Sequence, residues 1–140
     1  MVNAAVGVFD RPNWDEYFIN GAKWASTRAT CPRASVGAII VSADNRVLST
    51  GYNGAGHGEP HCFEVGCDVV DNHCQRALHA EVNAIAYAAR AGISLEGSRM
   101  YVYGYKGGAC RECAKVIKAA GITIAAMVGP GEALVEPETY

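Results

Sequence analysis

His79-Ala80-Glu81 and Cys110-Arg111-Glu112-Cys113 are the two short stretches around which the rest of the chain is arranged. Each stretch lies at the start of a predicted helix, and together they offer one imidazole and two thiolates to a metal ion. Structural zinc sites normally use four protein ligands, whereas catalytic zinc keeps one position open for water. His79, Cys110 and Cys113 therefore predict a catalytic zinc site, and Glu81 is the expected general acid and base.

Each stretch alone would be weak evidence. A single Cys-x-x-Cys is also typical of a redox pair or of half of a structural zinc site. The order of the two stretches, with a helix predicted after each, makes catalytic zinc the favoured interpretation. Both ligand segments would then lie at helix N-termini, where the helix dipole favours thiolates and anions.

The length of the chain indicates one compact domain over residues 1–140. No apolar run is long enough to cross a bilayer and no signal-peptide pattern appears, so we expect a cytoplasmic protein without a membrane partner. Six cysteines in such a chain favour metal binding over disulfides. The net charge of −2 argues against broad attraction to nucleic acid and favours a small substrate.

Hydrophobic periodicity predicts a three-layer α/β/α sandwich with a mixed central sheet. A capping box at Asn13 and Glu16 begins the first helix, which should run to about Thr30 with Trp14, Phe18 and Ala25 facing the core. Strands are predicted at 36–41, 46–50, 99–103 and 122–128, the first two forming a hairpin. The helix that begins at His79 should end at Gly92, and the helix that begins at Cys110 should end at Gly121. Their expected buried residues are Val82, Ile85, Ala86 and Ala89 in the first and Val116, Ile117 and Ala120 in the second.

Residues 55–78 are predicted to form a long loop, which in a small domain is usually functional or held by something. His61, Cys62, Cys67, His73 and Cys74 all lie in it. A metal ion is therefore the natural candidate for fixing this loop.

The chain resembles the deoxycytidylate (dCMP) deaminase family of the zinc-dependent cytidine deaminase superfamily over residues 11–128. His-x-Glu followed by Cys-x-x-Cys is the signature of zinc-dependent nucleobase deaminases. Further matching blocks are Arg11–Phe18, Cys31–Ala38, Gly51–Gly54, His61–Cys67, His73–Arg76 and His79–Ile85. The resemblance implies the cytidine deaminase-like fold and a hydrolase that converts dCMP into dUMP and ammonia, supplying dUMP for thymidylate synthesis.

Residue by residue, the resemblance implies that His79, Cys110 and Cys113 hold the catalytic zinc and that Glu81 shuttles the proton. Asn53 matches the family's sugar-binding Asn, and the backbone N–H of Ala80 should reach the base carbonyl. Some members hold a second, structural zinc. Cys31, Cys62 and His73 match its ligand positions, while Cys67, Cys74 and His61 compete for the fourth place.

The phosphate of a nucleoside monophosphate needs cationic partners, because backbone N–H groups rarely offset two negative charges. Arg33 and Lys106 are the predicted phosphate ligands. The resemblance also implies a homo-oligomer, either a hexamer or a dimer, with dCTP and dTTP as effectors and Mg²⁺ accompanying a nucleotide effector.

Two other functions stay open from the sequence. One is deamination of a modified cytosine nucleotide or of cytosine within nucleic acid, the latter disfavoured by the absence of a basic stripe. The other is a zinc-stabilised binding module without catalysis. Glu81 argues against that module, because a purely structural site needs no acid beside an open metal position.

Overall fold

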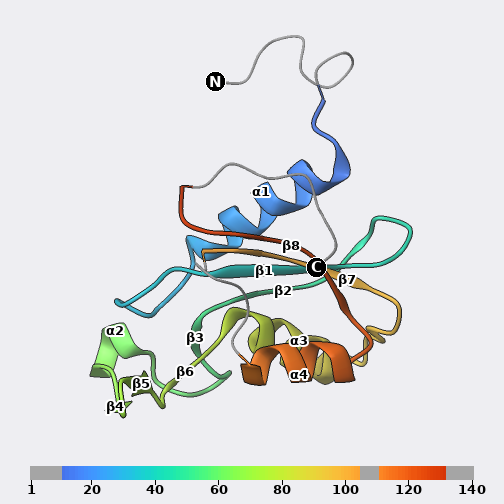
Figure 1. Cartoon of the computed structure of the whole chain (residues 1–140). Helices are drawn as coiled ribbons and strands as arrows, with labels where there is room; N and C mark the ends of the chain where they lie inside the picture. Colours follow the sequence, from blue (N-terminus) through green and yellow to red (C-terminus); the bar gives the residue numbers. More distant parts are fainter. Residues whose placement is uncertain (1–10, 105–110, 132–140) are drawn as a thin grey trace.

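A computed structural model of the chain describes residues 11–104 and 111–131. Four strands form the central sheet in the order β2-β1-β7-β8, with β1 antiparallel to both neighbours and β7 parallel to β8. They are β1 (Gly37–Val41), β2 (Val47–Tyr52), β7 (Arg99–Tyr103) and β8 (Thr123–Val128). Helix α1 (Trp14–Ser26) covers one face, and α3 (Ala80–Ala91) with α4 (Arg111–Ala119) covers the other (Figure 1). This arrangement confirms the predicted α/β/α sandwich and its mixed sheet.

Helix α1 begins as predicted, because the side-chain oxygen of Asn13 accepts a hydrogen bond from the Glu16 backbone N–H at 2.8 Å. Phe18, Ile19, Ala22 and Ser26 form its buried face. The prediction for Trp14 was wrong, since its side chain is 48% exposed and overhangs the start of the helix while stacking on Phe18. Trp24 is 78% exposed because it lies two residues from Ala22, on the opposite side of the helix.

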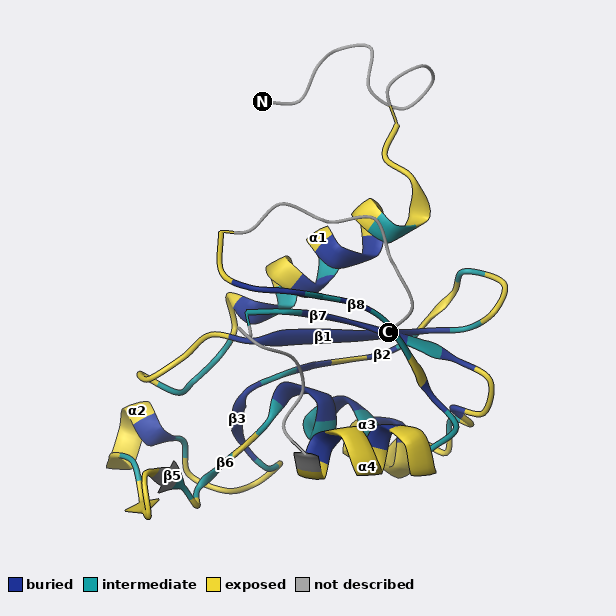
Figure 2. Cartoon of the chain, viewed as in Figure 1, coloured by how far each residue is buried: buried dark blue, intermediate teal, exposed yellow. Residues whose placement is uncertain are grey.

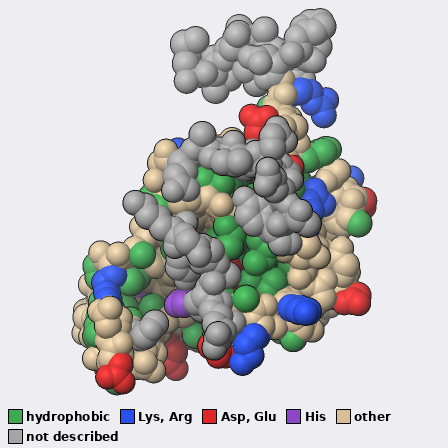
Figure 3. Space-filling model, in the orientation of Figure 1, with side chains coloured by type: hydrophobic (Ala, Val, Ile, Leu, Met, Phe, Trp, Pro, Cys, Tyr) green, Lys and Arg blue, Asp and Glu red, His purple; other side chains and the backbone are tan. Residues whose placement is uncertain are grey.

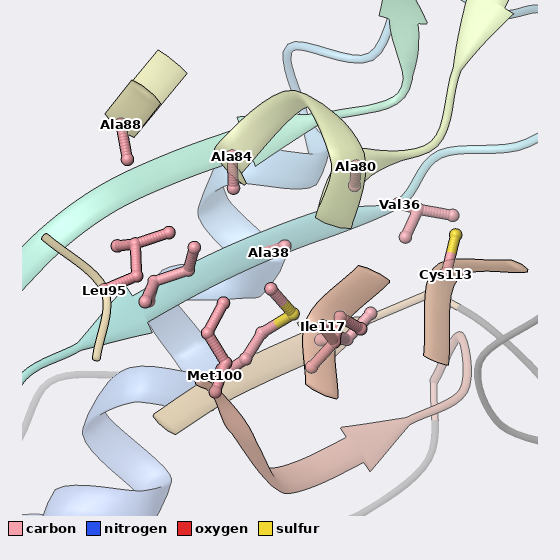
Figure 4. Close-up of a cluster of buried hydrophobic side chains, with 12 residues drawn as sticks. Val36, Ala38, Ala80, Ala84, Ala88, Leu95, Met100, Cys113 and Ile117 are labelled. Carbon is pink, nitrogen blue, oxygen red and sulfur yellow. The ribbon is translucent and has the colours of Figure 1, made fainter. Parts of the chain in front are cut away.

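Helix α3 packs on the sheet through Ala80, Ala84 and Ala88, which succeed one another at four-residue intervals (Figure 4). The predicted stripe was therefore displaced: Val82 and Ile85 are partly buried, whereas Ala86 and Ala89 are exposed. The physical reason is close approach to the sheet. A Cβ on Gly51 of β2 would lie 2.3 Å from the Ala80 carbonyl oxygen, so the contact leaves room for nothing larger than these small residues.

The end of α3 and the last strands follow the sequence closely, whereas α1 ends at Ser26, before the expected Thr30. Gly92 terminates α3 in a left-handed conformation with φ of 72°, as expected for a C-terminal glycine. Cys113 and Ile117 of α4 are buried against the sheet, as Figure 4 shows, whereas Val116 is 40% exposed and Ala120 is half-buried. Of the three residues predicted to be buried in α4, Ile117 is fully buried.

The predicted loop at 55–78 is a small lobe of short elements rather than an irregular segment. Strand β3 (Gly54–Ala55) pairs with β6 (Ala77–Leu78), and β4 (Val69–Val70) pairs with β5 (His73–Cys74). Helix α2 (Cys62–Val65) lies between them in sequence. Most of this lobe is exposed beside the body of the protein (Figure 2), so side-chain links must hold it. Within the described ranges, no helix has the length and apolar character needed to cross a membrane.

Candidate metal centre

The packing of α3 beside α4 brings two of the predicted zinc ligands together. His79 is the N-cap residue of α3, and Cys113 lies in the first turns of α4, where it is buried. The His79 Nδ1 and Cys113 Sγ atoms are 3.1 Å apart. Two donors at this separation can bind one zinc ion, since Zn–N is about 2.0–2.1 Å and Zn–S about 2.3 Å. Cys110, the third predicted ligand, lies outside the described residues.

Glu81 lies two residues after His79 and is completely buried. Neither of its carboxylate oxygens has a hydrogen-bond partner among the described residues. Burial raises the pKa of the Glu81 carboxyl, and the Glu81 backbone and then the Cys113 thiol offset part of that rise without satisfying either oxygen. Burying a polar group without a partner costs free energy. An acid kept in this position is therefore available to an external partner, as expected beside a metal and its water.

Three side-chain contacts fix α3, and with it His79, against the sheet. The Ser49 hydroxyl donates to the Ala84 carbonyl at 2.6 Å. The Asn83 side-chain amide donates to the carbonyls of Tyr52 at 2.9 Å and Gly54 at 3.2 Å. Sequence reasoning missed Ser49 and Asn83. Asn83 could have been found from the sequence, because it is a polar residue of low helix propensity that lies two positions after Glu81 in a predicted helix.

A cavity of about 270 Å³ lies between the small lobe and the start of α3. Its lining includes His79, Asn53, Arg33, Asn72, Cys31 and Cys74. This volume is near the lower end of the range for small-molecule sites, about 300–1,000 Å³. The structure thus places a predicted zinc ligand and two predicted substrate-binding residues, Asn53 and Arg33, around one hollow.

Asn53 is buried, and its side chain braces the chain that precedes β1. Its Oδ1 accepts from the Val36 backbone N–H at 2.8 Å, and its Nδ2 donates to the Ala34 carbonyl at 2.9 Å. An amide nitrogen carries two hydrogens. One Nδ2 hydrogen is therefore available for a ligand, and the same residue fixes the shape of the cavity wall.

The other predicted substrate contacts are placed in part. Arg33 is exposed at the cavity, and its Nη2 donates to Asn72 at 3.3 Å (backbone oxygen) and 3.2 Å (Oδ1). Ala80 is buried in the first turn of α3, where backbone N–H groups lack intrahelical partners. Lys106 lies outside the described residues.

A second group of potential ligands lies in the small lobe. The sulfur atoms of Cys62, Cys67 and Cys74 all lie within 4.8 Å of one another, and those of Cys62 and Cys74 are 3.5 Å apart. Burial and the neighbouring Cys74 thiol raise the pKa of Cys62 to about 12. A hydrogen bond from the Ala77 backbone lowers the pKa of Cys74 to about 7, which favours the thiolate that metals bind.

The remaining candidates for a second metal site are arranged around this thiol cluster of Cys62, Cys67 and Cys74. Cys31 is not one of its three members but lines the adjoining cavity with Cys74. The backbone of His73 belongs to β5, directly before Cys74. His61 uses its Nδ1 in a 2.9 Å hydrogen bond with the Thr30 hydroxyl. None of the five described cysteines forms a disulfide.

Comparisons with known proteins agree with this geometry. Residues 12–128 match the family model described as "Cytidine and deoxycytidylate deaminase zinc-binding region". The chain is 42% identical over 113 residues to ComE operon protein 2 of Bacillus subtilis, covering 81% of this chain and 58% of that protein. It is 38% identical over 123 residues to the deoxycytidylate deaminase of Mycobacterium phage D29, covering 80% of this chain and 91% of the phage protein. The chain thus spans little more than half the length of the Bacillus relative.

The structure also resembles a solved deaminase. The dCMP deaminase of cyanophage S-TIM5, in complex with dCMP and dUMP, superposes with a TM-score of 0.66 and 29% sequence identity. The match covers 81% of this chain and 80% of the cyanophage chain.

Proposed function

The chain belongs to the cytidine and deoxycytidylate deaminase zinc-binding family, and from this premise we propose that it hydrolyses dCMP to dUMP and ammonia. The observation that carries the proposal is Glu81, a fully buried acid beside the His79–Cys113 pair whose carboxylate oxygens have no hydrogen-bond partner among the described residues. The D29 relative is named a deoxycytidylate deaminase, and the S-TIM5 structure contains dCMP and dUMP. Both support a cytosine nucleotide as the substrate.

His79 and Cys113, with Cys110, are proposed to hold the catalytic zinc. When bound, zinc acts as a Lewis acid and supplies an activated water near neutral pH. His79 must be neutral to bind, because a protonated imidazole has no lone pair to offer. The deep position of Cys113 keeps its sulfur out of bulk water, so the thiolate needs the metal to be stable there.

Glu81 is proposed to carry the protons of the reaction. The attacking water loses a proton to the Glu81 carboxylate as its oxygen bonds to C4 of the cytosine. Glu81 then delivers that proton to the ring nitrogen N3, and a second proton from the same oxygen reaches the departing amino group. The sum is dCMP plus water giving dUMP plus ammonia. Burial raises the pKa of Glu81, and a raised pKa makes the carboxyl a better proton acceptor for this role.

The substrate is proposed to lie in the cavity with its base near His79. The Ala80 backbone N–H would contact the base carbonyl, and the remaining hydrogen on Asn53 Nδ2 would contact the sugar. Arg33, in the described part of the chain, is the first proposed phosphate ligand. Lys106, which lies outside the described residues, is the second proposed phosphate ligand. The lining of the cavity, which includes His79, Asn53 and Arg33, supports this placement.

A second, structural zinc is proposed for the thiol cluster. Cys62, Cys67 and Cys74 supply three ligands, and either His73 or Cys31 supplies the fourth that a closed structural site needs. The three cysteines come from α2, the segment after it and β5, so one ion would hold the whole small lobe. The homo-oligomer, the dCTP and dTTP effectors and their Mg²⁺ stay predictions of the family resemblance.

A substrate panel tests the proposed function. Zinc-loaded protein is incubated separately with dCMP, deoxycytidine, dCTP, cytidine and a cytosine-containing oligonucleotide, and ammonia release is measured. We expect the highest kcat/KM with dCMP. Ammonia release from the oligonucleotide alone would overturn the proposal. We do not expect this result, because the face seen in Figure 3 has cationic and acidic side chains interspersed rather than a basic stripe. Zinc binding without deamination of any substrate would favour the binding module.

A further inference from the structure

Arg33 is held by a neutral partner, so its positive charge is not offset by that contact. Its Nη2 donates to both the backbone oxygen and the side-chain oxygen of Asn72, at 3.3 and 3.2 Å. Within the described ranges, no carboxylate forms an ion pair with Arg33, and its Nε and Nη1 have no hydrogen-bond partner. An arginine oriented by amide oxygens keeps its full positive charge and several donors for a ligand.

The backbone position of Asn72 is set by a tight hairpin turn. It lies in the turn between β4 and β5, where Asp71 and Asn72 both have left-handed backbones, with φ of 50° and 64°. Two left-handed residues in a two-residue hairpin turn match the twist of the paired strands, and Asn and Asp tolerate this conformation better than most residues. The pairing of Val69 with Cys74 and of Val70 with His73 closes the hairpin.

The hairpin that carries Asn72 also carries a member of the thiol cluster. Cys74 follows Asn72 by two positions, and its sulfur lies 3.5 Å from that of Cys62 in α2. A second link is the Arg76 side chain, which donates to the Gly66 carbonyl at 3.0 Å. The position of Asn72 relative to the body of the protein therefore depends on how the small lobe is held.

Arg33 and Asn72 line the same cavity as His79 and Asn53. This cavity of about 270 Å³ therefore brings Arg33 and Asn72 to the same hollow as the proposed metal ligand His79. A cation at this boundary, oriented without being neutralised, is suited to an anionic group of a ligand.

We propose that Asn72 is a positioning residue that fixes the Arg33 guanidinium at the cavity, so that Arg33 binds the phosphate of a nucleoside monophosphate. The inference rests on the proposed function for the identity of the nucleotide. It adds a determinant of specificity supplied by the small lobe: the hairpin that the thiol cluster holds selects the phosphorylated substrate over the nucleoside.

Equilibrium binding of the product and its nucleoside tests this inference without any turnover. The affinities of zinc-loaded protein for dUMP and for 2′-deoxyuridine are measured by calorimetry, and their ratio reports recognition of the phosphate. Asn72→Gly removes the side-chain acceptor while keeping the left-handed backbone. Asp71→Gly is the matched control, since it makes the same change in the same turn without removing a partner of Arg33.

We expect Asn72→Gly to lower the preference for dUMP by about threefold to tenfold, because one hydrogen bond to the neutral side-chain acceptor that orients Arg33 is lost. Its affinity for 2′-deoxyuridine, its zinc content and its melting temperature should match those of Asp71→Gly. Arg33→Ala should abolish most of the preference, and Asp71→Gly should not reduce it.

Three results would overturn the inference. They are an unchanged preference in Asn72→Gly, an equal loss of affinity for both ligands, and a wild-type protein that binds dUMP no better than 2′-deoxyuridine. The second result would identify Asn72 as a structural tie of the lobe alone. Failure of the wild type to release ammonia from dCMP would instead overturn the proposed function, and the binding comparison would still decide the role of Asn72.

Discussion

Replacing Glu81 by Gln separates the proposed proton shuttle from the metal site, because the amide has nearly the same volume and cannot carry the proton. Glu81 is the one buried carboxyl in the described part of the chain. No other described acid is therefore placed to take over its role. General acid–base catalysis contributes about 10²–10⁴-fold. We expect Glu81→Gln to lower kcat for dCMP by at least about a hundredfold, which corresponds to about 2.7 kcal/mol of activation free energy.

The same substitution should leave folding intact. Both Glu81 oxygens lack hydrogen-bond partners among the described residues, so no internal hydrogen bond there is broken. An unpaired carboxylate costs more to bury than an amide of the same shape. We therefore expect a free energy of unfolding equal to or above that of the wild type, and an unchanged zinc content.

The assay compares ammonia release, zinc per chain and thermal unfolding for the wild type, Glu81→Gln and Glu16→Gln. Glu16 is an exposed carboxylate of α1, which covers the opposite face of the sheet, so its substitution should leave turnover unchanged (Figure 1). Near-normal deamination by Glu81→Gln would refute the role given to this carboxyl. Loss of zinc from the same variant would show that Glu81 acts on the metal rather than on the proton.

Three further predictions concern the metals and the packing of α3. Cys113→Ala should remove the catalytic zinc and abolish deamination, and metal analysis that finds the zinc content unchanged would contradict this ligand assignment. Metal-replete wild type should contain two zinc ions per chain. Cys62→Ser should lower this number to one and reduce the melting temperature, because metal binding stabilises the fold. A wild-type protein with one zinc ion per chain would contradict the second zinc site. Gly51→Ala should destabilise the protein by about 1–3 kcal/mol and lower kcat, since its Cβ would lie 2.3 and 2.6 Å from backbone atoms of α3. Gly56→Ala is the control, because a Cβ there would make only an ordinary 3.5 Å contact with the Leu78 side chain. Equal denaturation midpoints for the two variants would show that α3 does not pack as closely on Gly51 as the structure indicates.

Some ends of the elements could be predicted from the sequence because they depend on local backbone chemistry, although α1 ends at Ser26 rather than near Thr30. Asn13 caps α1, Gly92 ends α3, and the strand expected at 99–103 is β7 to the residue. The helix starts that carry His79-Ala80-Glu81 and Cys113 follow from the same kind of signal. The zinc chemistry could be named at once, because few residue combinations outside metal sites place an acid between His and a Cys pair in this order.

Which face of each helix is buried was decided by the tertiary structure. Periodicity gives the spacing of a stripe, but the stripe that faces the sheet depends on how closely the sheet approaches. Gly51 admits α3 so closely that Ala84 and Ala88 face inward while the larger Val82 and Ile85 remain at the margin. The sequence alone favoured the larger residues, since it contains no information on that distance.

The partners of the polar residues also depended on three dimensions. The sequence offered six candidates for a second metal site, and folding gathered Cys62, Cys67 and Cys74. Folding also brought the Arg33 guanidinium to Asn72, 39 positions away in the sequence, and placed the Asn53 amide in hydrogen bonds with the backbone that precedes β1. Residue types therefore determined which chemistry the chain can perform, because ligands and acids are properties of side chains. The folded chain determined which of them meet, because contact across a loop depends on how the lobe and the sheet pack, and no local sequence signal encodes that.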